Sequence, residues 1–143
     1  MPSLNLYMCN KCMFIICPLG WGGYFYVIDD SGNRIPCPHP GEENKVKEIL
    51  GRWVTKRKRK ERTGFNSYCI CLECLEKFEL DIGDEEENKN SWRYHYNALI
   101  KRDERKCPKC GSFNVKTAFE LIDKTCPKCK EGIIKEHDPG FIT

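Results

Sequence analysis

The chain has 143 residues and a net charge of only +3, with 40% hydrophobic and 31% charged residues. Eleven of the residues counted as hydrophobic are cysteines, so too little aliphatic material remains for one large core. Small domains of this kind usually need disulfides, a metal or a partner for stability. No stretch approaches the ~18 consecutive apolar residues of a membrane-spanning helix. The composition therefore argues against a transmembrane protein and against a single large aliphatic domain.

The compartment decides whether the cysteines are oxidised. The first residues, Met1 to Met8, show no charged segment, no long apolar run and no cleavage site of the kind that a secretion signal has. We therefore expect a cytoplasmic protein, or a nuclear one if the source is a nucleated cell. Thiols stay reduced there, and reduced cysteines spaced in pairs are typical metal ligands. The odd number of cysteines agrees, because disulfides alone would leave one thiol over.

A first module is expected over residues 1–54. Residues 24–28 are rich in β-formers, and residues 30–33 favour a hairpin turn before a returning strand that ends at Cys37. A short helix should follow, because four apolar residues fall at positions i, i+3, i+4 and i+7: Val46, Ile49, Leu50 and Trp53.

A basic linker is expected over residues 55–67, because its charged part has nothing that can face a core. The segment 52–62 carries seven basic residues against one acid, which gives a local charge of 7 − 1 = +6. Such a run is typical of phosphate contacts with nucleic acid, but also of a solvated linker. The rings of Trp53 and Phe65 favour nucleic acid slightly, because bases stack on such rings. The candidate nucleic-acid-binding residues are Arg52, Lys56, Arg57, Lys58, Arg59, Lys60 and Arg62.

A second module is expected over residues 68–143. Its acidic stretch at residues 84–90 is typical of an exposed loop. A short helix should follow, with Trp92, Tyr96 and Leu99 at i, i+4 and i+7. Farther on, apolar and polar residues alternate, which favours a strand or a hairpin at Phe113, Val115, Thr117, Phe119 and Leu121.

Eight of the cysteines form four Cys-x-x-Cys pairs. Two thiolates separated by two residues can turn around one metal, so each pair supplies half of a tetrahedral site. One such pair is a weak signal, but four in one short reduced chain strongly indicate metal ligation. The pairs are Cys9/Cys12, Cys71/Cys74, Cys107/Cys110 and Cys126/Cys129.

At these pairs the chain resembles the zinc-ribbon superfamily. Residues 71–80 look like a first knuckle running into its strand, and residues 107–111 match the Cys-Pro-x-Cys-Gly form of a second knuckle, whose glycine permits a left-handed turn. Residues 126–132 repeat this form with the glycine displaced. The resemblance is detailed only at the knuckles. It implies a small metal-stabilised fold, β-rich or α+β, with tandem zinc-ribbon-like modules, two short helices and Zn²⁺ as the cofactor.

The sequence leaves open which pairs share a metal. In one arrangement Cys71/Cys74 share a metal with Cys107/Cys110 across the acidic loop. In the other, Cys107/Cys110 share a metal with Cys126/Cys129 in a compact hairpin. In either arrangement one pair of the second module still needs partners, from Cys69, from the first module or from another chain.

The first module departs from the family pattern at its second knuckle. Residues 37–41 have a proline where the last cysteine should stand, so His39 is the natural substitute and a site of Cys9, Cys12, Cys37 and His39 is preferred. Cys17 competes with this reading as a ligand, but it is equally compatible with a small buried apolar side chain. If Cys17 and Cys69 both bind metal, twelve ligands are present and the chain holds three zinc ions rather than two.

No catalytic apparatus is recognisable, so we expect no enzyme, no catalytic residue and no small-molecule substrate. There is no phosphate-binding glycine loop, no His-Glu-x-x-His helix and no nucleophile elbow. The first hypothesis is a zinc-binding module that contacts nucleic acid, as a regulator or as part of a transcription, translation or processing assembly. The second is an adaptor that docks on a protein partner. A rubredoxin-like iron electron carrier is a third reading.

Overall fold

The computed structural model describes residues 5–20, 22–38, 41–83 and 100–137. The described part is rich in β-structure and contains three helices. Its strands are β1 (Asn5–Cys9), β2 (Ile15–Gly20), β3 (Gly23–Ile28), β4 (Arg34–Pro36), β5 (Thr63–Cys71), β6 (Lys77–Leu80), β7 (Val115–Thr117) and β8 (Ile134–His137). Its helices are α1 (Glu42–Leu50), α2 (Lys56–Arg62) and α4 (Ala118–Leu121). No helix among these residues is long and apolar enough to cross a membrane.

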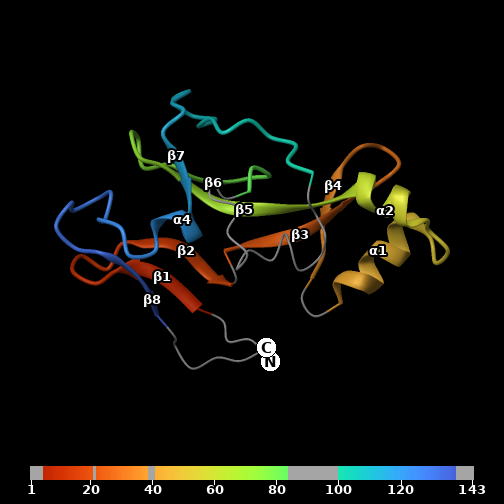
Figure 1. Cartoon of the computed structure of the whole chain (residues 1–143), viewed down its shortest axis with the longest axis horizontal. Helices are drawn as coiled ribbons and strands as arrows, with labels where there is room; N and C mark the ends of the chain where they lie inside the picture. The colour runs from red at the N-terminus through yellow and green to blue at the C-terminus, as the bar shows by residue number, and fades with distance from the viewer. Residues whose placement is uncertain (1–4, 21, 39–40, 84–99, 138–143) are drawn as a thin grey trace.

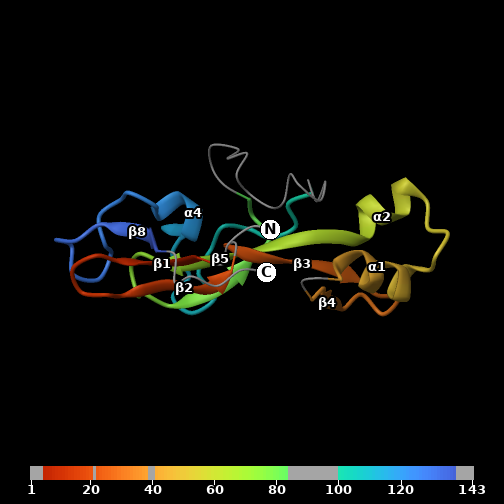
Figure 2. The ribbon, with the colours of Figure 1, turned by 90° about the horizontal axis from the view of Figure 1, so that it is seen from below.

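The strands form two antiparallel sheets. The smaller sheet has the order β2-β1-β8, so a strand near the beginning of the chain pairs with one near its end, Tyr7 opposite Glu136. The larger sheet has the order β4-β3-β5-β6, with β7 also paired to β5. Figures 1 and 2 show an elongated molecule, with β1, β2, β8 and α4 at one end and α1 and α2 at the other.

Strand β5 connects the two ends of the molecule. Its first half, from Thr63 to Ser67, pairs with β3, and its second half pairs with β6 and β7. Nearly every residue of β5 is buried, as expected for a strand covered on both faces. The expected linker over residues 55–67 is therefore structured in full: its basic part is α2 and its last five residues are strand. Tertiary packing decided this, because the short run of apolar and polar residues after the charges carries no helical or strand periodicity of its own.

The first hairpin is confirmed. Strands β3 and β4 pair with Val27 opposite Ile35, and the turn between them contains Gly32 at a φ of 85°. The Asp29 carboxylate accepts hydrogen bonds from the backbone N–H groups of Ser31 and Asn33, which fixes the turn.

The first helix is confirmed for part of its expected length. Val46 and Leu50 of α1 are buried in a cluster with Phe25 and Val27, but α1 ends at Leu50. Gly51 terminates it at a φ of 98°, which favours glycine. Trp53 is consequently outside the helix and 88% exposed, not part of its buried face as the spacing predicts.

The alternating pattern near residue 113 is only partly a strand. Strand β7 covers Val115–Thr117, and α4 then begins because Thr117 and Glu120 form a capping box, in which each side chain bonds to the other residue's backbone N–H. The Thr-x-x-Glu spacing that signals this capping box is visible in the sequence itself. The helix expected at Trp92 and the acidic stretch lie outside the described residues.

Candidate metal centres

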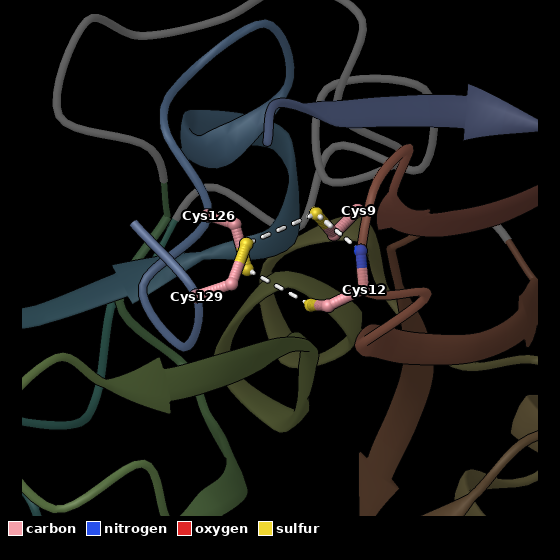
Figure 3. Close-up of side chains that lie close together, drawn as sticks. All are labelled: Cys9, Cys12, Cys126 and Cys129. Carbon is pink, nitrogen blue, oxygen red and sulfur yellow. Dashed lines mark hydrogen bonds between the residues drawn. The ribbon is translucent and has the colours of Figure 1, made fainter. Parts of the chain in front are cut away.

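The first centre joins the two ends of the chain. Cys9 ends β1, Cys12 follows in the next turn, and Cys126 and Cys129 lie in the loop before β8. The pairing of β1 with β8 brings these two loops together, and Figure 3 shows the four sulfurs pointing toward one another. All four Sγ atoms lie within 4.8 Å of one another.

The second centre lies at the end of β5. Cys71 is the last residue of that strand, Cys74 follows in the turn to β6, and Cys107 and Cys110 come from the loop before β7. The four Sγ atoms again lie within 4.8 Å of one another. The returning segment 100–106 is held in place before Cys107, since Arg102 donates a 2.6 Å hydrogen bond to the Thr63 carbonyl.

The distances between sulfurs suit a tetrahedral metal. They are 3.6 Å for Cys9/Cys129 and 3.7 Å for Cys12/Cys126 in the first centre. In the second they are 3.5 Å for Cys71/Cys110 and 3.6 Å for Cys74/Cys107. A tetrahedral ion with metal–sulfur bonds of about 2.3 Å holds its sulfurs about 3.8 Å apart. A disulfide needs a sulfur distance of about 2.05 Å, and the ten cysteines described are all free thiols.

Backbone N–H groups point at the sulfurs in both centres. Cys9 Sγ accepts from the N–H of Lys11 at 3.3 Å and of Cys12 at 3.4 Å. Cys107 Sγ accepts from Lys109 and Cys110, each at 3.4 Å. These bonds stabilise thiolates, the form in which cysteine binds a metal. The donor set therefore fits a metal ion at each centre.

All four Cys-x-x-Cys turns share one backbone form. In each, the residue after the second cysteine donates its N–H to the carbonyl of the first cysteine. That residue has a left-handed backbone in every case, at Met13 (φ 62°), Leu75 (62°), Gly111 (77°) and Lys130 (60°). Only one of the four is the glycine that the family pattern favours, so three turns carry local backbone strain, each on the order of 1 kcal/mol.

The displaced glycine of the fourth turn has a separate role. Gly132 donates its N–H to Cys129 Sγ at 3.3 Å and accepts from the N–H of Cys126 at 2.9 Å. A methyl group on Gly132 would overlap the Sγ of Cys9 and approach Lys11 Cβ to 2.8 Å. Glycine is therefore required here because the opposite turn of the same centre packs directly against the backbone.

Two thiols of the first centre, Cys12 and Cys129, differ in acidity. In the first centre, the N–H groups of Glu131 and Gly132 lower the pKa of Cys129 to about 6. The pKa of Cys12 is about 11, because the lowering effect of the Phe14 N–H is outweighed by desolvation and by the neighbouring thiols. One sulfur is thus readily ionised, while another keeps its proton until a cation arrives.

The second centre shows the same division. Desolvation raises the pKa of Cys107, but the N–H groups of Cys110 and Lys109 outweigh it and bring the value to about 7. The pKa of Cys110 is raised to about 12, because the lowering effect of the Ser112 N–H is smaller than the effect of the neighbouring thiols and of desolvation. A metal ion would supply the positive charge that lets all four ionise.

The preferred site of Cys9, Cys12, Cys37 and His39 requires Cys37 to lie with Cys9 and Cys12, and the structure does not group these three cysteines. The structure groups Cys9 and Cys12 with Cys126 and Cys129 instead. Cys37 is buried under α1, and its Sγ lies 3.9 Å from the Ile35 carbonyl. The β3–β4 hairpin carries Cys37 toward α1, whereas the pairing of β1 with β8 brings Cys9 and Cys12 to Cys126 and Cys129. His39 lies outside the described residues.

The open question of pairing in the second module has a clear answer in the fold. Cys71/Cys74 lie with Cys107/Cys110, as one of the two alternatives has it, and Cys126/Cys129 find their partners in the first module. The two centres are therefore nested along the chain, not in tandem. Cys69 is buried with its Sγ 3.2 Å from the Ser67 carbonyl and is in neither group.

The basic segment forms a surface at the far end from both centres. Lys56 to Arg62 make up α2, and Arg52 lies before it with its guanidinium 5.5 Å from the Trp53 ring. Phe65, by contrast, is 2% exposed within β5 and cannot stack on a base.

Comparisons with protein-family models, with curated proteins and with solved structures find no match to this chain. The class of protein is therefore defined by the two four-cysteine centres alone: a small β-rich domain with two clusters that could hold metal ions.

Proposed function

We propose that this chain is a non-enzymatic module, stabilised by two zinc ions, that binds nucleic acid through α2. Each zinc is held by one of the two tetrads described above. Four thiolates of suitable spacing close the coordination sphere of a tetrahedral ion and leave no open position for a substrate or a reactive water. This closed donor set supports a structural role for the metal. Reduced thiols also need a reducing compartment, which supports a cytoplasmic or nuclear protein.

Two arginines of α2 form ion pairs with acidic residues elsewhere in the chain. Arg59 forms a two-armed ion pair with Glu43 of α1. Arg62 donates to the Ile28 carbonyl at 2.8 Å and to the Asp30 carboxylate at 3.1 Å. These two arginines lie three positions apart and face the body of the protein, where they hold α2 in place.

The remaining basic side chains of α2 are the observation that supports binding to nucleic acid. The side chains of Lys56, Lys58 and Lys60 are exposed and form no hydrogen bond or ion pair with any described residue. Within the described part of the chain Arg57 pairs only with Glu61, and both side chains are largely exposed, so this contact is weak and can be exchanged for a phosphate. Several cations on one exposed short helix are repelled by one another, and a polyanion relieves that repulsion.

The test is the salt dependence of binding to nucleic acid. Labelled oligonucleotides are titrated with the zinc-loaded protein over a range of salt concentrations. Replacing Lys56, Lys58 and Lys60 together by Gln should weaken binding and reduce the slope of log affinity against log salt by about 2 to 3, since each phosphate contact contributes about 0.7 to 0.9.

A matched control replaces three lysines elsewhere. Lys11, Lys109 and Lys135 each pair with an acid near the metal centres, and changing them to Gln removes the same charge. This variant should keep most of the affinity and the slope. Absence of binding by the unmodified protein at low salt would refute the proposal.

A protein-binding adaptor is the second candidate. Three exposed apolar side chains lie at the first centre: Met13, Ile15 and Ile133. Ile133 accepts a backbone hydrogen bond from Asn10 of the opposite turn, so these side chains belong to neighbouring loops. If the adaptor is the correct function, changing Met13 and Ile133 to Ser abolishes partner binding while the lysine substitutions in α2 have no effect.

A further inference from the structure

Trp53 is the most exposed large hydrophobic side chain among the described residues. It is 88% exposed, whereas the next, Met13 and Phe113, are 65% and 63% exposed. Exposing a large indole to water is unfavourable, because removing apolar surface from water is the dominant favourable contribution to folding. The structure of the surrounding loop explains why this ring remains in solvent.

The loop that carries Trp53 is held at both ends. Gly51 donates its N–H to the Lys47 carbonyl at 2.9 Å, and the Thr55 hydroxyl accepts from the N–H of Lys58 at 3.1 Å. Val54, the next residue, packs against the cluster beneath α1. Because Gly51, Val54 and Thr55 are anchored, the backbone on either side of Trp53 is held in place and presents the ring to solvent.

The surroundings of the ring are basic. Arg52 places its guanidinium 5.5 Å from the ring centroid, which orients the indole and covers part of one face. Helix α2 begins three residues after Trp53, with Lys56 and Lys60 four positions apart on one side of the helix. A flat ring next to cations that contact phosphates is the combination by which proteins bind single-stranded nucleic acid.

The same surface is poorly suited to a duplex. In a duplex the faces of the bases are covered by their neighbours, so an aromatic ring finds no base to stack on. Helix α2 has seven residues and is about 10 Å long, and its inward arginines, Arg59 and Arg62, are bound to Glu43 and Asp30. They are therefore not available to read guanine edges in a groove.

We infer that the nucleic acid is single-stranded, and that one of its bases stacks on Trp53 while Arg52, Lys56 and Lys60 contact the flanking phosphates. This inference rests on the proposed function and specifies its ligand. Because stacking and phosphate contacts are largely independent of sequence, the surface should bind single strands with little sequence preference.

The test compares strands with duplexes. Fluorescence anisotropy measures binding of the zinc-loaded full chain to single-stranded DNA and RNA of about 15 nucleotides, and to the DNA duplex of the same sequence, at about 50 mM salt. The single strands should bind more tightly than the duplex. Trp53→Ala should weaken single-strand binding by about 5- to 150-fold, the range for losing one stacked base. Trp53→Phe should restore most of it, and neither change should alter the salt slope.

The control variant is Phe113→Ala. Phe113 is also an exposed ring with a cation above it, Lys106 at 5.6 Å, but it lies next to the second metal centre. This variant should bind as the unmodified chain does, and thermal melting of all variants checks that they are folded. The DNA and RNA probes show which sugar is preferred, and tighter binding of either strand supports the inference.

Two results would overturn the inference. If the duplex binds as tightly as the single strands, or if Trp53→Ala binds as well as the unmodified chain, the surface is not a stacking site, although the proposed function stands. If no probe binds at all, the proposed function fails and the inference fails with it.

Discussion

The Sγ atom of Cys9 lies 3.6 Å from that of Cys129, although the two residues are 120 positions apart in the chain. The contact depends on the pairing of β1 with β8. A metal at this centre closes a loop that contains the larger sheet, the second centre and all three described helices. Closing a long loop removes many unfolded conformations, so this ion should stabilise the whole fold rather than one turn.

Removing one ligand of the first centre should release the metal of that centre and leave the metal of the second centre bound. We expect Cys129→Ser to reduce bound metal from two ions per chain to one, because the second tetrad is intact. The free energy of unfolding should fall by about 4 kcal/mol or more. Elemental analysis gives the stoichiometry, and hydrogen exchange should show faster exchange in β1 and β8 than in β5.

The control for this experiment is Cys37→Ala. Cys37 is buried but belongs to neither tetrad, so this variant should keep two metals and lose only about 1 kcal/mol of stability. Loss of a metal from the Cys37 variant would contradict the assignment of the first centre.

The turn at Cys129 contains two positions, Lys130 and Gly132, at which substitutions should act in opposite directions. Gly132→Ala should weaken metal binding at the first centre, because the new methyl overlaps Cys9 Sγ. Lys130→Gly should stabilise the protein by about 1 kcal/mol, because its left-handed backbone, with φ at 60°, is strained for lysine and not for glycine.

Thermal unfolding of the metal-loaded variants measures both effects. The melting temperature should fall for Gly132→Ala and rise by a few degrees for Lys130→Gly. Equal effects of the same sign would show that the turn does not have the described backbone.

Metal binding should release protons and weaken as the pH falls. In the free centres the pKa of Cys12 is about 11 and that of Cys110 about 12, so both thiols are protonated at pH 7 and must lose their protons to become ligands. At least one proton should therefore leave each centre, and the affinity should rise about tenfold or more per pH unit. Calorimetry in buffers of different ionisation enthalpy counts the protons. Binding without proton release would contradict the pairing of the thiols.

A buried ionic network supports the larger sheet independently of the metals. Asp81 is fully buried, accepts a hydrogen bond from the Tyr26 hydroxyl and lies 3.7 Å from the Arg102 guanidinium. Arg102→Met should destabilise the protein by about 3 kcal/mol, because a buried carboxylate loses its cationic neighbour.

The double variant Arg102→Met with Asp81→Asn should recover part of this loss, since it removes the buried charge as well. Chemical denaturation measures the changes, and elemental analysis should still find two metals. Loss of a metal in the single variant would show that the network and the centres are one unit.

The hairpin and α1 could be predicted because their signals are local. The turn at Gly32 and the apolar spacing of Val46 and Leu50 act within a few residues, and both are found as expected. The end of α1 was less predictable, because the apolar spacing continues to Trp53 while Gly51 stops the helix. At Thr117 a capping box overrode the alternating pattern, and there the signal was present in the sequence.

The sequence by itself determined that the chain has four turns that could each supply half of a metal site, since a Cys-x-x-Cys pair forms its half-site from neighbouring residues. Tertiary structure alone decided which halves meet. That choice depends on the pairing of β1 with β8 and on the position of β5, which are contacts between residues far apart in the chain. Four half-sites of similar chemistry can be combined in several ways, and only the burial of the sheets and the loops they connect selects the nested one.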